Sequence, residues 1–146
     1  MSTEQVALAR GIAYAAHVGV VDKIGQPYID HPRRVAARLG RLDEQAVAWL
    51  HVVVEDTDVK EEVLRAAGVD EEVIAAVLLL SRNMGDKDGY YERIKASPLA
   101  RAVKLADIAD NTDPARTALL DEETRNKLAE RYRNARRALG AEEENE

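Results

Sequence analysis

Two of the three histidines in this chain lie beside carboxylates. His31 falls in the segment PYIDHP and His51 in AWLHVVVEDT, while His17 has no acidic neighbour. Imidazole and carboxylate ligands together suit manganese, iron, cobalt or zinc better than calcium. A single histidine is more often a surface or core residue, so these positions by themselves are only a weak indication of a metal site.

A second group of polar residues lies in the segment KLADIADN, residues 104–111. In a helix, Lys104, Asp107 and Asn111 share one face, because they stand at positions i, i+3 and i+7. A solvated helix face is the simpler interpretation of such a row. The residues between them are almost all apolar, however, so we expect Asp107 to be at least partly buried. A buried charge needs a partner, and a metal ion is one candidate.

The acidic pair Glu55 and Asp56 follows His51 closely. Glu55 comes one helical turn after His51 and therefore shares its face. A carboxylate there could orient or deprotonate an attacking water. An acidic pair that ends a helix in solvent is an equally good interpretation of these two residues alone.

The composition excludes several classes of protein. The 146 residues are 46% hydrophobic and 33% charged, which indicates one globular domain with a real core. Cysteine is absent, which excludes disulfides, zinc thiolate sites and thiol nucleophiles. The net charge of -6 disfavours a nucleic-acid partner. Neither a membrane-spanning run nor a secretory signal is visible, so we expect a cytoplasmic protein without a membrane partner.

The pattern of caps and apolar residues predicts an all-α protein, a compact bundle of about six to eight helices. The predicted helix starts include Asp30, Asp43, Asp58, Asp70 and Asp121, with a proline-assisted start at 97–98. The third helix should run from residue 43 to about residue 54. The runs HVVVED and AAVLLL could be strands on propensity alone, but their helical flanks favour helices. We expect one domain over residues 1–140 and an acidic flexible tail over 141–146.

Three motifs in this order resemble a known family: PYIDHP, then AWLHVVVEDT, then VKLADIADN. The chain looks like the HD-domain alarmone (ppGpp) hydrolases, the RelA/SpoT-type hydrolase domain and its small stand-alone relatives. The resemblance runs from about residue 13 to about residue 139. It implies an HD-domain fold, a role in the stringent response, and removal of the 3′-pyrophosphate from (p)ppGpp-like nucleotides.

The resemblance also implies roles for individual residues. The family holds one divalent ion, commonly manganese, with two histidines and two aspartates. His31, His51 and Asp107 match three of these ligands, and Glu55 and Asp56 match the acidic pair that serves the attacking water. The residues expected near the nucleotide are Lys23, Ser81, Arg82, Tyr91, Lys104 and Asn111.

One residue departs from the family motif, because Val52 stands where the family has the aspartate of its His-Asp pair. Valine cannot bind a metal, so one ligand is missing and metal affinity should fall. Val52 could be an engineered inactivating change, a natural member that binds nucleotide without cleaving it, or a variant that works with three protein ligands. The other motif residues are intact, which favours a recent or deliberate change.

Four functions therefore remain open. The first is an alarmone hydrolase whose activity Val52 impairs. The second is an inactive nucleotide-binding or sensing protein, and the third is an HD hydrolase of another phosphate ester. The fourth is a helical interaction module without a ligand, since the charged residues 125–133 fit a solvated face equally well.

Overall fold

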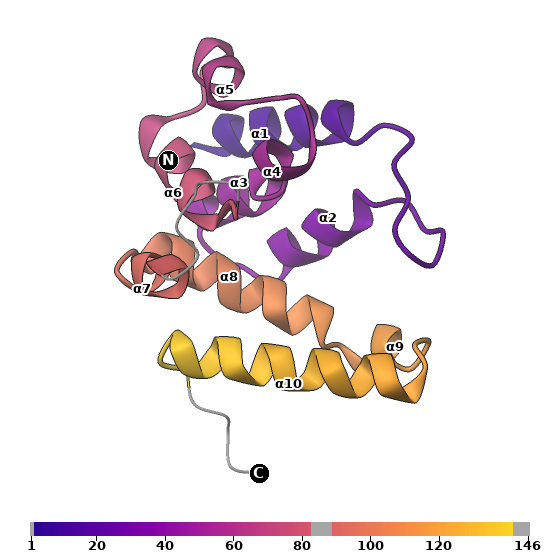
Figure 1. Cartoon of the computed structure of the whole chain (residues 1–146). Coiled ribbons are helices and arrows are strands. Elements are labelled where there is room, and N and C mark those ends of the chain that lie inside the picture. The colour runs from indigo at the N-terminus through magenta and orange to yellow at the C-terminus, as the bar shows by residue number, and fades with distance from the viewer. Residues whose placement is uncertain (1, 83–88, 142–146) are drawn as a thin grey trace.

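The computed structural model of the chain describes residues 2–82 and 89–141, and within these residues the fold is all helical (Figure 1). The helices are α1 (Thr3–Ala16), α2 (Asp30–Ala37), α3 (Leu42–Leu50), α4 (Val53–Asp56), α5 (Glu61–Ala67), α6 (Glu71–Leu80), α7 (Tyr90–Lys95), α8 (Pro98–Asn111), α9 (Pro114–Thr117) and α10 (Glu122–Ala138). Eight of these ten have at least six residues, and α4 and α9 are single turns. The predicted all-α bundle is confirmed.

The runs that could have been strands are helical. The run AAVLLL lies in α6, which buries five of its ten residues. The run HVVVED consists of a turn at His51 and Val52, directly after α3, and all of α4. The bridge between Val21 and Pro27 is the one isolated β-bridge in the described parts of the chain. Val53 and Val54 are buried in α4, so burial outweighed their weak helix propensity at these two positions.

Helix α3 is the centre of the bundle. It packs against α1, α2, α6 and α8, and all of its residues from Ala46 to Leu50 are buried. Helix α2 also packs on α8, so α2, α3 and α8 contact one another in pairs. Figure 1 shows that α8 lies between α2 on one side and the long helix α10 on the other. The three helices that meet pairwise are those that carry the candidate metal ligands.

Helix α8 begins as the sequence predicts. The Ser97 side chain accepts a hydrogen bond from the Ala100 amide at 3.1 Å, and Pro98 is the first helical residue. The predicted cap at Asp121 is also present, since its side chain accepts from the Thr124 amide at 2.7 Å. Such caps satisfy amides that have no partner inside the helix.

Two aspartates that were predicted to cap helices lie inside the first turn of those helices instead. Helix α2 has Ile29 as its cap, and Asp30 is its first helical residue. Helix α3 begins at Leu42, one residue before Asp43, because the Asp43 carboxylate is held by the Arg41 guanidinium at 3.0 and 3.1 Å. Asp43 therefore lies in the first turn, where its charge still suits the positive end of the helix.

The predicted start at Asp58 was also wrong, because the chain is not helical between Thr57 and Lys60. The Thr57 hydroxyl accepts a hydrogen bond from the Val59 amide, and the Lys60 ammonium donates to the Val54 and Thr57 carbonyls at 2.7 and 2.9 Å. These side chain to backbone bonds stabilise a turn in place of a helix. Helix α5 consequently begins at Glu61.

No helix in the described residues is long and apolar enough to cross a membrane. The core consists mainly of alanine, valine, leucine and isoleucine side chains, with Trp49 as its largest member. The predicted acidic tail lies outside the described residues except for Ala141. The division into a domain over 1–140 and a tail therefore stays a prediction.

Candidate metal centre and cavity

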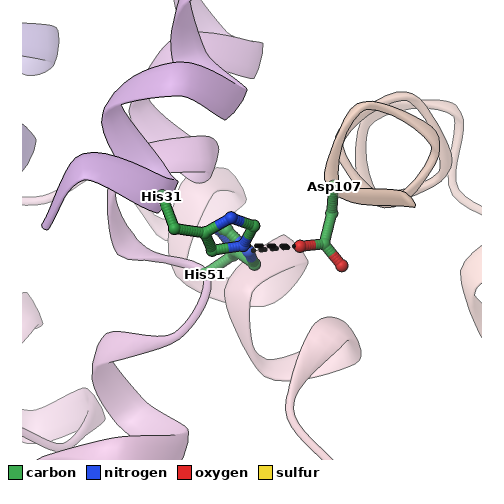
Figure 2. A group of neighbouring side chains, drawn as sticks. All are labelled: His31, His51 and Asp107. Carbon is green, nitrogen blue, oxygen red and sulfur yellow. Dashed lines mark hydrogen bonds and ion pairs between the residues drawn. The ribbon is translucent and has the colours of Figure 1, made fainter. Parts of the chain in front are cut away.

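Three elements bring His31, His51 and Asp107 together. His31 lies in the first turn of α2, His51 directly follows α3, and Asp107 lies in α8. The Nε2 atom of His31 is 2.8 Å from Oδ1 of Asp107, and Nε2 of His51 is 3.3 Å from the same oxygen. Figure 2 shows both rings pointing toward the Asp107 carboxylate. The sequence separations of 76 and 56 residues show that tertiary packing, not local structure, assembles the cluster.

The opposite nitrogen of each ring is already engaged. Nδ1 of His51 lies 2.6 Å from the carbonyl oxygen of Ala48, which can only accept a hydrogen bond. Nδ1 of His31 lies 2.7 Å from a carboxylate oxygen of Asp110. Both Nδ1 atoms therefore carry a proton, and each Nε2 atom faces Asp107. Burial alone would lower the pKa of His31, but its hydrogen bonds with Asp107 and Asp110 raise that pKa to about 9, so a metal ion would take the place of the Nε2 proton of His31.

This donor set fits a divalent transition metal. A lone pair on Nε2 and a carboxylate oxygen repel each other unless a cation, either a proton or a metal ion, lies between them. One ligand atom from each of the three residues lies within 4.8 Å of the others. Neutral imidazole nitrogen and carboxylate oxygen are ligands of zinc, manganese, iron and cobalt.

Asp107 contacts both histidines of the cluster and is only 6% exposed. Its Oδ2 atom accepts from the Lys104 ammonium at 3.3 Å, and its Oδ1 atom accepts from the Asn111 amide at 3.4 Å. Burial alone would raise the pKa of Asp107, but the two histidine contacts and the Lys104 charge hold it well below its usual value. The row of Lys104, Asp107 and Asn111 therefore faces inward and keeps the carboxylate ionised, ready to bind a cation.

Val52 interrupts the helix beside this cluster. It caps α4, and the break between α3 and α4 falls at His51 and Val52. The predicted continuous third helix to residue 54 is therefore two helices, in line with the poor helix propensity of valine. The Val52 side chain is 8% exposed and lines the same cavity as His51, to which it adds apolar surface and no ligand atom.

Glu55 and Asp56 lie in α4, and both line the cavity. Glu55 has a structural contact as well, because its Oε2 atom accepts a hydrogen bond from the Arg82 backbone amide at 2.9 Å. Burial, with help from the Asp56 carboxylate, raises the pKa of the neighbouring Tyr28 hydroxyl. Tyr28 therefore stays a neutral hydrogen-bond donor on this side of the cavity.

The cavity has a volume of about 420 Å³. Four of the residues predicted to contact nucleotide line it: Lys23, Arg82, Lys104 and Asn111. Ser81 and Tyr91 are not among its lining residues. Ser81 is buried at the end of α6, and the Tyr91 hydroxyl accepts a hydrogen bond from the Arg82 guanidinium at 3.2 Å.

Several lining residues were not singled out from the sequence. They are Tyr28, Arg34, Tyr90, Arg116, Arg131 and Tyr132. Tyr28 and Arg34 flank His31 in the sequence at distances of three residues, a spacing that could have identified them. Tyr90 and the residues of α9 and α10 gave no such signal, because their position depends on how distant helices pack.

Asp110 was also missed. It is fully buried, and its Oδ1 atom lies 2.9 Å from Arg34 Nε and 2.8 Å from Arg116 Nη2. Burial alone would raise the pKa of Asp110, but hydrogen bonds from His31 and Arg34 lower it to about 2. The group is therefore a permanent anion behind the His31 ring.

Comparison with known proteins extends this description. No family model matches the chain. In an alignment of 118 positions that covers 73% of the chain, it is 35% identical to the guanosine-3′,5′-bis(diphosphate) 3′-pyrophosphohydrolase of Haemophilus influenzae. The match spans only 17% of that relative. A solved structure, described as a metazoan ortholog of SpoT that hydrolyzes ppGpp and plays a role in starvation responses, matches with a TM-score of 0.77.

The chain is thus similar, in sequence and in fold, to proteins that act on ppGpp. The structural match covers 95% of this chain and 87% of the other at 21% identity, so it demonstrates the fold. The resemblance and the HD-domain bundle predicted from the sequence are confirmed. The chain thus shares the helical fold of this solved structure.

Proposed function

We propose that this chain is a metal-dependent phosphohydrolase that removes the 3′-pyrophosphate from ppGpp-like nucleotides. The observation that carries the proposal is the cluster of His31, His51 and Asp107 in the wall of a cavity that also holds Glu55 and Asp56. The activity named for the Haemophilus influenzae relative and for the SpoT ortholog supports the choice of substrate.

His31, His51 and Asp107 would hold one divalent ion, for which we propose manganese. When bound, the ion would supply Lewis-acid polarisation of a phosphoryl oxygen. The protein contributes two imidazoles whose Nδ1 protons are fixed by Ala48 and Asp110, so that the Nε2 atoms, which face Asp107, are the ring atoms that would bind the ion. The fixed tautomers reduce the reorganisation that binding requires.

Glu55 and Asp56 would position the attacking water and accept one of its protons. The water oxygen forms a bond to the 3′ phosphorus, and the bond from that phosphorus to the ribose 3′ oxygen breaks. The ribose oxygen gains a proton, and pyrophosphate leaves. The Oε2 atom of Glu55 accepts a hydrogen bond from the Arg82 backbone amide, which holds this carboxylate in the wall of the cavity.

Local cations would offset the phosphate charges despite the net charge of -6. Lys23 and Arg82 line the cavity, and the Arg82 guanidinium lies 4.5 Å from the centre of the Tyr90 ring, which holds it in place. Lys104 is already paired with Asp107, so its main role is to balance that carboxylate. Asn111, Ser81 and Tyr91 remain predicted nucleotide contacts.

A second candidate is a nucleotide-binding protein without turnover. It is favoured by Val52, which gives the cavity an apolar group where the family motif has an aspartate ligand. Lys23 and Arg82, the cations that would hold the nucleotide, line this cavity as well. Such a protein would bind ppGpp and release no product even with manganese present.

The first experiment is pyrophosphate release from ppGpp with manganese, comparing the chain with V52D. Cleavage by V52D alone would support a hydrolase scaffold whose turnover depends on that aspartate. Cleavage by both would mean that three protein ligands suffice. Binding of ppGpp without cleavage by the native chain supports the second candidate, and neither binding nor cleavage by either form contradicts both.

Two controls sharpen this comparison. A panel of other phosphate mono- and diesters tests whether the scaffold hydrolyses a different substrate. Fractionation of cells that express the chain tests the cytoplasmic location, which is part of the proposal. Activity confined to another ester would contradict ppGpp as substrate while leaving the metal centre in place.

A further inference from the structure

The carboxylate of Asp110 lies on the far side of the His31 ring from Asp107. Asp110 is in the last turn of α8, three residues after Asp107, and none of its surface is exposed. Its Oδ2 atom is 2.7 Å from His31 Nδ1. The His31 ring is therefore held between two carboxylates of one helix, one at each nitrogen.

The second oxygen of Asp110 is occupied by cations. Oδ1 is 2.9 Å from Arg34 Nε and 2.8 Å from Arg116 Nη2, and Arg38 Nη2 is 3.9 Å away. Arg34 belongs to α2, as His31 does, and Arg116 belongs to α9. These contacts fix Asp110 itself, so the carboxylate is a rigid acceptor for the imidazole and not a mobile one.

This geometry determines the chemistry of His31. A carboxylate bound by two guanidinium groups is ionised and can only accept, so the proton of the hydrogen bond belongs to Nδ1 of His31. The Nε2 atom, which faces Asp107, is then the nitrogen available to a metal. Carboxylates in this position raise the basicity of a histidine ligand and fix its orientation.

We propose that Asp110 is a positioning residue that fixes the tautomer and the ring orientation of His31 for metal binding. The proposal rests on the metal centre of the proposed function. The contribution of Asp110 matters more in this chain than in a site with four protein ligands, because the cluster in the described part of the chain has three ligands, His31, His51 and Asp107. If one of three ligands loses its orientation, a larger share of the metal-binding free energy is lost than if one of four does.

The first test uses the metal-free protein and needs no bound ion. Two-dimensional NMR of ¹⁵N-labelled histidine reports which ring nitrogen carries a proton, and the His31 signals are assigned by their loss in H31N. The spectra are recorded above pH 9, the pKa of His31, so that the ring carries a single proton. There we expect this proton on Nδ1 in the native chain and a mixture of the two tautomers in D110N. A His31 ring that is protonated only on Nε2 in the native chain would overturn the proposal, whether or not D110N folds.

The second test measures affinity for Co²⁺ by calorimetry and by visible absorption in the V52D background. Removal of such a second carboxylate typically weakens metal binding by about 10- to 100-fold, so we expect this loss in V52D/D110N. The matched control is V52D/D113N. Asp113 binds Arg38 at 3.1 Å, caps α9 and makes no contact with His31, and asparagine caps as well as aspartate.

The outcomes separate the two proposals. A loss of affinity in D110N but not in D113N supports Asp110 as a positioning residue. Equal losses of affinity in both variants would mean that removal of a negative charge beside the arginines explains the effect of D110N, and this would overturn the proposal. If V52D itself binds no Co²⁺, the proposed metal-dependent function is contradicted, while the tautomer measured by NMR still decides whether Asp110 fixes His31.

Discussion

The Nδ1 atom of His51 lies 2.6 Å from the carbonyl oxygen of Ala48, three residues earlier in the same chain segment. The His51 ring is thus fixed by the end of its own helix. His31 differs, because its Nδ1 partner is Asp110, 79 residues away. One ligand of the candidate metal centre is therefore oriented locally and the other only by tertiary packing.

The change V52D should have opposite effects with and without metal. In the metal-free protein a new carboxylate at this buried position lacks a partner, and we expect a loss of roughly 1–3 kcal/mol in the free energy of unfolding. With manganese at 100 times the dissociation constant, binding should stabilise the V52D protein by about 2.7 kcal/mol. Thermal unfolding of both proteins, with chelator and with manganese, measures both effects.

V52N is the control for these two opposite effects on stability. Asparagine has the size of aspartate without its charge, so it should destabilise the metal-free protein and gain little from manganese. Equal manganese stabilisation of V52D and V52N would argue against a metal ligand at this position.

Asp107→Ala should abolish metal binding. The substitution removes the one carboxylate that both Nε2 atoms face, and it leaves the buried Lys104 ammonium without its anion. Loss of one partner from a buried ion pair costs about 3–5 kcal/mol, so the unfolding temperature should also fall. Elemental analysis after dialysis against manganese measures the bound metal.

Asp107→Asn and Asp58→Ala complete this test. The asparagine variant keeps the volume of the side chain and should fold better while still binding metal poorly. Asp58 is exposed, and its loss should change neither metal content nor stability. Metal content that is unchanged in both Asp107 variants would remove this residue from the metal centre.

Glu55→Gln should separate the structural contact of this side chain with the Arg82 amide from its proposed role as proton acceptor. Its amide oxygen can still accept from the Arg82 backbone amide, so the fold and metal binding should be retained. Glutamine cannot accept a proton from water at neutral pH, so turnover of ppGpp should fall by about 10²–10⁴-fold in whichever form is active. Unchanged turnover, measured with saturating substrate, would show that Glu55 has no proton role.

Ser97→Ala should destabilise the helix that carries Lys104, Asp107 and Asn111. The Ser97 hydroxyl satisfies the Ala100 amide at 3.1 Å, and the loss of such a cap costs about 1 kcal/mol. Chemical denaturation measures the change. Ser97→Asp, which restores a capping oxygen and adds a favourable charge, should recover the loss; if both variants are equally destabilised, the cap is not the cause.

The helices and part of the site could be predicted from the sequence because they depend on local rules. The caps at Ser97 and Asp121 satisfy amides within three residues, and the row of Lys104, Asp107 and Asn111 follows from 3.6 residues per turn. The start at Asp58 was mispredicted because the Lys60 and Thr57 side chains bind the backbone there, a competition that spacing does not reveal.

The sequence by itself determined an all-α chain and the identity of the residues His31, His51 and Asp107. Only the tertiary structure brought them together. The helices that carry them are held against one another by burial of apolar faces, and because the hydrophobic effect is non-directional, the sequence pattern does not reveal which helices will be neighbours. Packing also decided the role of Asp110. In the segment LADIAD it looks like a second copy of Asp107, and it becomes the partner of His31 only where α2 and α9 bring arginines against α8.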